Sequence, residues 1–109
     1  MTEAAVKNML AESRIPVFRS HAPIGTPVPY MVYHVNYPDN FGADNVTYFK
    51  VPQYTVDLYQ TSPNELVRET IEAILTENGF YFTEDEADME NQNLFITYYY
   101  FGGLNNVEK

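Results

Sequence analysis

Three stretches of this chain place large side chains on alternating sides, and this pattern constrains the fold more than any other feature. They run from Tyr30 to Tyr37, from Tyr54 to Gln60 and from Asn93 to Phe101. A period of two is the period of a β-strand, whose successive side chains point to opposite faces. In the first stretch both sets are large, which predicts a central strand covered on two sides. In the second, Tyr54, Val56 and Leu58 are expected to point inward and Thr55, Asp57 and Tyr59 outward.

The strongest local signal is Ser62-Pro63-Asn64-Glu65, which predicts the start of a helix. Ser62 is expected at the N-cap, Pro63 at the first helical position and Glu65 where a capping carboxylate belongs. Asn78-Gly79 predicts the end, because glycine readily takes the left-handed conformation that follows a helix. The period predicts buried Val67, Ile71, Ile74 and Leu75 and exposed Arg68, Glu69, Glu72 and Glu77.

Shorter elements flank these segments. An apolar stripe predicts a helix from Thr2 to about Ser13, and the X-Pro step at Ile15-Pro16 predicts a short edge strand. A further strand is expected to begin at 80–82 and to end in an acidic loop before Asn93. We therefore expect an α+β fold, with a mixed or mainly antiparallel sheet of four to five strands and two helices packed on one face.

The length of 109 residues predicts one domain. We expect that domain to span residues 1–103, with a long loop at 37–50, and residues 104–109 to form a frayed C-terminal tail. Asp, Asn and Gly dominate the first part of the long loop, which is turn chemistry.

The charge balance argues against a grip on nucleic acid. Fifteen Asp and Glu face six Lys and Arg, for a formal net charge of −9. Holding DNA or RNA requires several phosphate-facing cations on one surface, and here the cations are scattered along the chain. The sequence also lacks a run of about 18 apolar residues, so we expect no membrane partner.

The polar residues match no recognisable catalytic or metal-binding pattern. The chain has no Cys, and neither His21 nor His34 belongs to a recognisable catalytic motif. His34 is expected to be a packed or interface imidazole. The acidic run Glu84, Asp85, Glu86, Asp88 and Glu90 lacks the spacing of a calcium loop, so a solvated loop is expected instead. We therefore predict no catalytic residue, no cofactor and no metal site.

The aromatic content points to a contact surface. Ten Tyr and seven Phe exceed what one small core needs, and Tyr is enriched at protein interfaces. We expect Tyr59, Tyr99 and Phe101 on the sheet face opposite the helices. Two interpretations stay open for them: a two-sided sheet whose hydroxyls reach solvent, and an oligomer contact.

The order of these elements resembles the tail-completion and tail-terminator-like proteins at the head-to-tail junction of long-tailed bacteriophages. The segments that carry the resemblance are an N-terminal helix, Ile15-Pro16-Val17, Pro29-Tyr30-Met31-Val32-Tyr33, Asn40, Ala43-Asp44-Asn45, Tyr54-Thr55-Val56-Asp57-Leu58-Tyr59, Ile71-Glu72 and Leu94-Phe95-Ile96-Thr97-Tyr98-Tyr99. These are patterns of residue type and include no catalytic signature.

The resemblance implies a structural protein of the virion neck, made in the host cytoplasm. Its subunits would form a ring, expected to be hexameric, that contacts the tail tube protein and the head connector or stopper protein. DNA would pass through the ring without being bound specifically. The long loop would reach a neighbour or the lumen, through Tyr37, Asp39, Asn40, Phe41, Asp44, Asn45, Phe49 and Lys50.

Two other classes of function stay open on the sequence alone. A small intracellular protein-protein interaction module unrelated to virions would be a stable monomer or dimer with a single partner. An enzyme would show a concave pocket in which polar groups of perturbed pKa converge.

Overall fold

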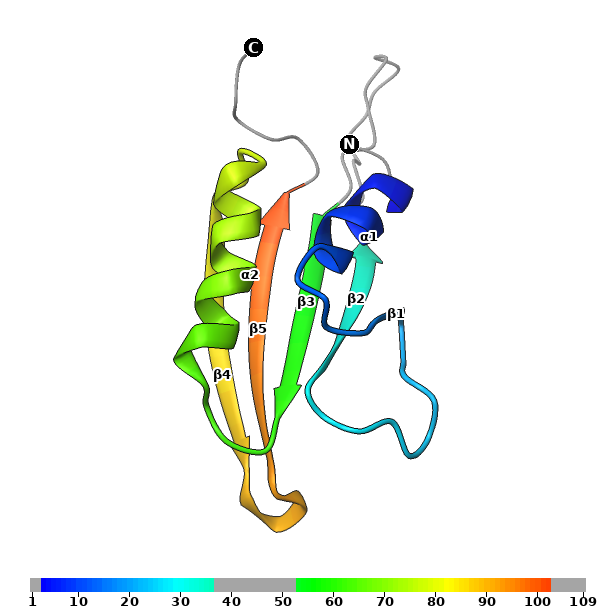
Figure 1. Cartoon of the computed structure of the whole chain (residues 1–109), viewed down its shortest axis with the longest axis vertical. Helices are drawn as coiled ribbons and strands as arrows, with labels where there is room; N and C mark the ends of the chain where they lie inside the picture. Colours follow the sequence, from blue (N-terminus) through cyan, green and yellow to red (C-terminus); the bar gives the residue numbers. More distant parts are fainter. Residues whose placement is uncertain (1–2, 37–52, 103–109) are drawn as a thin grey trace, which may run out of the picture.

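The computed structural model describes residues 3–36 and 53–102 of the chain (Figure 1). In chain order the elements are α1 (Glu3–Ala11), β1 (Val17–Arg19), β2 (Tyr30–Asn36), β3 (Gln53–Gln60), α2 (Glu65–Glu77), β4 (Phe82–Met89), the short 3-10 turn η1 (Glu90–Gln92) and β5 (Leu94–Gly102). The predicted loop 37–50 and tail 104–109 lie outside the described residues, and the assignment of a single domain stays a prediction.

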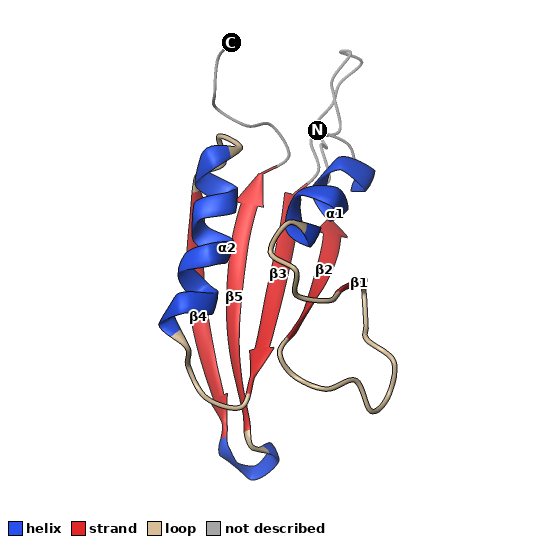
Figure 2. Cartoon of the chain, viewed as in Figure 1, coloured by secondary structure: helices blue, strands red, loops and turns tan. Residues whose placement is uncertain are grey.

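The strands form one five-stranded sheet in the order β1-β2-β3-β5-β4 (Figure 2). β1 pairs with β2 in parallel, and the other neighbours are antiparallel. The predicted α+β class with a mixed sheet is therefore confirmed, and the segment after Pro16 does supply an edge strand. β4 and β5 form a long hairpin closed by η1.

The register divides the side chains of the sheet into two faces, because directly paired residues point to the same side. Tyr33, Val56 and Tyr99 occupy one row across β2, β3 and β5. This row belongs to the same buried cluster as apolar residues of both helices. In Figure 1, α1 lies in front of β2 and β3, and α2 in front of β5 and β4. We call this side the helix face and the other side the open face.

The core lies between the helices and the helix face. Its buried members are Val6, Met9, Leu10, Met31, Tyr33, Tyr54, Val56, Leu58, Ile71, Ile74, Leu75, Phe80, Tyr99 and Phe101. Phe101 packs between two other rings, with centroids 5.5 Å from Tyr54 and 4.9 Å from Phe80. A fully buried side chain of this kind contributes about 1.5–3 kcal/mol to folding, so this layer is the main source of stability.

The prediction that Ser62 caps α2 is wrong, because the cap is Asn64. Asn64 has an extended backbone, and its side-chain oxygen accepts hydrogen bonds from the N–H groups of Leu66 at 3.0 Å and Val67 at 3.4 Å. Asn is at least as good an N-cap as Ser, and here it satisfies two N–H groups. The predicted end is confirmed, since Gly79 has a φ of +85°.

The predicted acidic loop is also wrong, because Glu84, Asp85, Glu86 and Asp88 lie in strand β4, and only Glu90 lies in η1. Glu84 and Glu86 point to the helix face, where each places an oxygen 3.0 Å from Arg68. Arg68 also lies 3.5 Å from Glu65, and its side chain is only 12% exposed, contrary to the prediction of an exposed residue. The carboxylates thus fasten the edge strand to α2.

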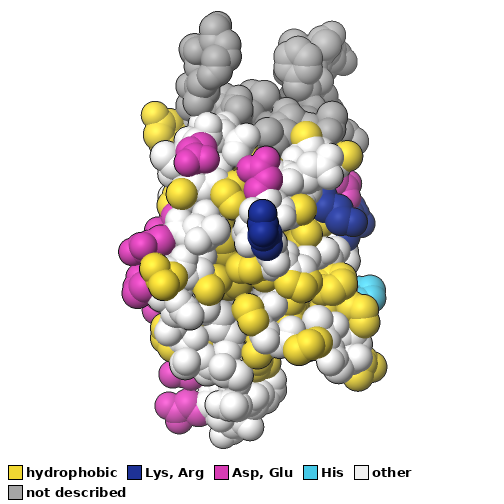
Figure 3. Space-filling model, in the orientation of Figure 1, with side chains coloured by type: hydrophobic (Ala, Val, Ile, Leu, Met, Phe, Trp, Pro, Cys, Tyr) yellow, Lys and Arg dark blue, Asp and Glu magenta, His cyan; other side chains and the backbone are white. Residues whose placement is uncertain are grey.

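The surface of the helix side carries an apolar belt across its middle (Figure 3). A basic side chain projects from the belt, and acidic side chains gather along the edge formed by α2 and β4. Leu66, in the first turn of α2, is a large hydrophobic residue that is 75% exposed. The helix side therefore offers apolar surface to a partner despite the acidity of the chain.

Candidate interaction surface on the open sheet face

The open face carries three adjacent rows of side chains across β2, β3, β5 and β4. The central row consists of Val32, Asp57, Tyr98 and Asp85. The rows on either side are Tyr30, Tyr59, Ile96 and Ala87, and His34, Thr55, Tyr100 and Thr83. Neither α1 nor α2 lies over these rows. We call the set Tyr30, Val32, His34, Asp57, Tyr59, Ile96, Tyr98 and Tyr100 the open-face patch.

Aromatic rings take the place of a covering layer in this patch. Tyr30 stacks on Tyr59 with ring centroids 4.7 Å apart, and Phe18 meets Tyr30 edge-on at 6.3 Å. Val32 and Ile96 are only 3% and 4% exposed, although they point away from the helices. Phe18 pairs with Val32 and Tyr59 with Ile96, and these two rings are themselves partly exposed, so aromatic surface faces outward.

Asp57 is the buried charge of the patch. It is 7% exposed, and its Oδ2 lies 3.2 Å from Nε2 of His34. Its Oδ1 is buried and has no hydrogen-bond partner among the described residues. Burial raises the pKa of the Asp57 carboxyl, and His34 partly opposes that rise. A buried carboxylate oxygen without a partner costs free energy, so this site is incomplete within the part of the chain that the structure describes.

Tyr98 lies between two carboxylates in the central row, since it pairs with Asp57 on one side and Asp85 on the other. Burial raises the pKa of the Tyr98 phenol, and the charges of Asp57, Tyr100 and Asp85 raise it further. The pKa of Tyr59 is raised in the same way, by burial and then by Asp57. The centre of the patch is therefore both aromatic and electronegative, which suits a cationic side chain of a partner.

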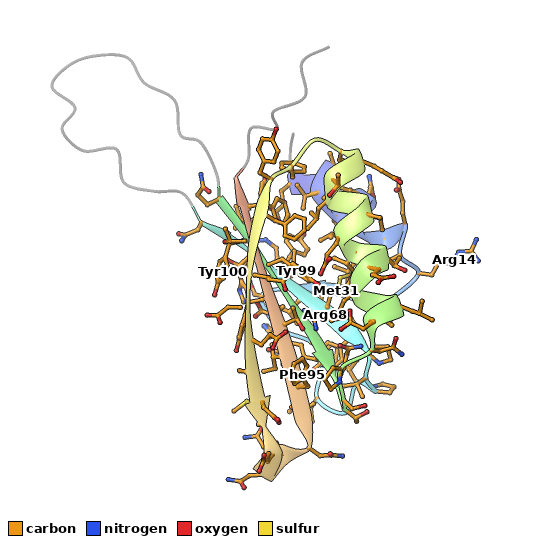
Figure 4. All side chains as sticks on the ribbon, turned by 90° about the vertical axis from the view of Figure 1, so that its left-hand side faces the viewer. Arg14, Met31, Arg68, Phe95, Tyr99 and Tyr100 are labelled. Atoms are coloured by element: carbon orange, nitrogen blue, oxygen red, sulfur yellow. The ribbon has the colours of Figure 1, made fainter. Side chains whose placement is uncertain are left out.

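The predicted face residues divide between the two sides. Tyr59 lies on the open face, but Tyr99 and Phe101 are 0% and 3% exposed and lie in the core beneath the helices. Figure 4 shows Tyr99 and its neighbour Tyr100 pointing to opposite sides of the sheet. The prediction for Tyr99 and Phe101 is wrong because their partners Val56 and Tyr54 are inward residues. The alternation of residues divides the side chains of β5 into two sets, and the pairing of β5 with β3 shows which set faces the helices.

The sequence contains a signal for Asp57 and His34, although it does not show that they lie together in one patch. Asp57 interrupts a strand of apolar and aromatic residues, and it was predicted to point outward together with Tyr59. His34 was expected to be a packed or interface imidazole, and it lies in the patch beside Asp57. The eight predicted loop residues, Tyr37, Asp39, Asn40, Phe41, Asp44, Asn45, Phe49 and Lys50, lie outside the described residues.

Other polar groups serve the fold or lack converging chemistry. A hollow of about 470 Å³ at one end of the sheet is lined by Asn36, Gln53, Tyr54, Thr55, Tyr81, Phe82, Thr83, Tyr100, Phe101 and Gly102. This lining includes no carboxylate, imidazole or amine that could act as a general acid or base. Within residues 3–36 and 53–102, no cluster of three His, Asp or Glu is placed to hold a metal ion.

Comparisons with known proteins add no relative. No protein-family model matches the chain, and no curated protein matches it. None of the helices in the described part of the chain has the length and apolarity needed to cross a membrane.

Proposed function

We propose that this protein is a structural subunit of a bacteriophage neck. Its copies form a ring, expected to be hexameric, that completes or terminates the tail tube and joins it to the head connector. The observation that carries the proposal is the open-face patch, a partly exposed aromatic surface that neither helix covers. The order of helices and strands, which resembles that of tail-completion and tail-terminator-like proteins, supplies the biological setting.

The patch supports a function in binding other proteins. Contiguous apolar surface on a soluble domain commonly marks a protein contact, and tyrosine supplies both apolar area and a polar tip at such contacts. Several charged residues of the described chain are paired within the fold. Glu65, Glu84 and Glu86 are occupied with Arg68, and Glu72 accepts the hydroxyl hydrogen of Tyr99 at 3.0 Å. These groups stabilise the fold.

The acidity of the chain fits a ring through which DNA passes. With a net charge of −9 per copy, the subunits repel a polyanion and do not retain it. Carboxylates that face the bore would keep exiting DNA from adhering to its wall. Neutralising them should slow the ejection of DNA, and normal ejection by such mutants would contradict this role.

The test is a phage that lacks the gene for this chain. Negative-stain microscopy of the lysate should show separate heads and tails, and complementation with the unchanged gene should restore joined particles. Complementation with Tyr98→Glu, which places a charge in the open-face patch, should fail. Tyr81→Glu makes the same change at an exposed tyrosine outside the patch, and it should restore joining. Joined, infectious particles without the gene would contradict the proposal and favour an interaction module unrelated to virions.

A further inference from the structure

Asp57 is a nearly buried carboxylate whose side chain is 10% exposed, and among the described residues its charge is compensated by His34 alone. One carboxylate oxygen has His34, while the other is buried and unpaired within the described part of the chain. The neighbouring ring of Tyr98 is open to contact from the same side. A guanidinium group suits this pair of features, because it can donate to a carboxylate and also stack on an aromatic ring.

The Lys and Arg residues in the described part of the chain differ in whether they already form ion pairs. Arg19 is bonded to Glu3, and Arg68 is held by its carboxylates. Lys7 and Arg14 are exposed and make no ion pair with the described residues. Arginine is the better match to a carboxylate beside a ring, since lysine is a compact point charge. Arg14 is therefore the candidate.

Arg14 is held in a fixed turn between α1 and β1. Its N–H donates to the carbonyl of Ala11 at 3.0 Å, and Ser13 Oγ accepts from the N–H of Ile15 at 3.1 Å. The φ of Arg14 is 67°, a left-handed conformation that favours glycine. Figure 4 shows its side chain projecting away from the sheet on the helix side, which also carries the apolar belt of Figure 3.

We propose that the open-face patch of one copy binds the helix side of a second copy, with Arg14 of the second copy paired to Asp57 of the first. The inference rests on the proposed ring function and identifies the contact that builds the ring. Arg14 and Asp57 lie on opposite sides of the same chain, so they cannot meet within one copy. A contact between opposite sides is head-to-tail, and a repeated head-to-tail contact closes into a ring when its rotation allows.

The first test compares two charge reversals in the purified full chain. Arg14→Glu should weaken self-association, measured by sedimentation velocity over a concentration series, by about tenfold or more. Lys7→Glu makes the same change in net charge at another exposed position of the helix side, and it should change the association constant by less than about twofold. Equal effects of the two reversals would show that only net charge matters, and would contradict the Arg14 contact.

The second test mixes two variants that each lack one half of the contact. Asp57→Asn keeps a working Arg14 side, and Arg14→Glu keeps a working Asp57 face. Each variant alone should stay monomeric where the unchanged chain assembles, because each copy has lost one side. Their equimolar mixture should form a heterodimer and stop there, since only one of the two possible contacts between them is intact.

Three results would overturn the inference. The unchanged chain could remain monomeric at its highest soluble concentration, or the mixture could fail to form the heterodimer. Alternatively, Arg14→Glu could assemble normally while Asp57→Asn does not, which would assign the patch another occupant, such as the tail tube protein. None of these results removes the neck function, which the gene-deletion phage tests separately. Circular dichroism of each variant establishes that it is folded.

Discussion

The two faces of the sheet differ in how completely their buried charged groups are paired. Under α2, the guanidinium of Arg68 lies 3.0 Å from both Glu84 and Glu86. On the open face, Asp57 has one contact with His34 and one buried oxygen without a partner in the described chain. In the first cluster both terminal nitrogens of Arg68 are paired with carboxylates and hold two elements together, although its Nε is buried without a partner in the described chain. In the second, a single imidazole faces the carboxylate of Asp57, so its charge is compensated less completely by the described residues.

The largest loss of stability is expected when Arg68 is removed from its cluster of carboxylates. Arg68→Met keeps the aliphatic length of the side chain but leaves three carboxylates close together. We expect the free energy of unfolding to fall by about 2 kcal/mol, less than for a fully buried pair, because the three carboxylates left behind are 38–74% exposed and solvent screens their repulsion. Urea denaturation measures this change. Arg14→Met, at an exposed arginine, should change it by less than about 0.5 kcal/mol, and equal losses would show that the Arg68 cluster adds nothing specific.

A smaller loss is expected where a single hydrogen bond is removed from the covered face. Tyr99 is buried, and its hydroxyl donates to Glu72 at 3.0 Å. Tyr99→Phe should lower the free energy of unfolding by about 1–2 kcal/mol, because the carboxylate loses a charge-assisted bond. Tyr100→Phe is the matched change on the open face, and the same urea titration should detect almost no effect. A larger loss of stability for Tyr100→Phe than for Tyr99→Phe would contradict the assignment of the two faces.

Removing the charge of Asp57 on the open face should raise the free energy of unfolding, whereas the changes on the covered face lower it. Asp57→Asn removes a buried charge, so we expect the free energy of unfolding of the monomer to rise by about 1 kcal/mol near neutral pH. Because the folded pKa of Asp57 is raised, ionisation costs stability, and this cost develops as the pH rises through that pKa.

Urea titrations at several pH values check the sign. The advantage of Asp57→Asn should shrink as the pH is lowered through the raised pKa of the Asp57 carboxyl, because the unchanged chain then takes up a proton there and loses the buried charge. A variant that is less stable than the unchanged monomer at neutral pH would show that the fold itself needs the charge. The titrations are made at protein concentrations below those at which the chain self-associates, so that they compare the two monomers.

The smallest effect is expected at the other half of the proposed contact. Arg14→Gly relieves a left-handed backbone at an exposed position, so the monomer should gain about 0.5 kcal/mol. The same variant should lose self-association, because the guanidinium is gone. Thermal denaturation and sedimentation of one preparation measure both quantities. A variant that is more stable and still assembles would show that Arg14 is dispensable.

Much of the covered face could be predicted from the sequence, because local patterns determine it. The apolar period of α2 identified Ile71, Ile74 and Leu75, and Gly79 marked the end of the helix. The alternation of β3 placed Asp57 and Tyr59 on the outward side. These signals depend on neighbours in the chain, which a single sequence displays.

Apart from the N-cap of α2, which lies at Asn64 two residues after the predicted Ser62, the errors concern contacts between distant segments. The acidic residues of β4 have low strand propensity, and they extend as a strand because β5 pairs with them and Arg68 binds Glu84 and Glu86. Tyr99 was placed on the wrong face because pairing between strands cannot be determined from alternation. The open-face patch combines residues of β2, β3 and β5, so no single stretch of sequence displays it.

Hydroxyl-radical footprinting of the free and the assembled chain tests the central claim most directly, namely that the open face is the working surface. In the free monomer, Tyr98 and Tyr100 should be oxidised readily, and the buried Tyr99 should not. In assembled particles, the account predicts strong protection of Tyr98 and Tyr100, with Tyr99 unreactive as before. Oxidation of Tyr98 and Tyr100 at the same rate in both states would contradict it.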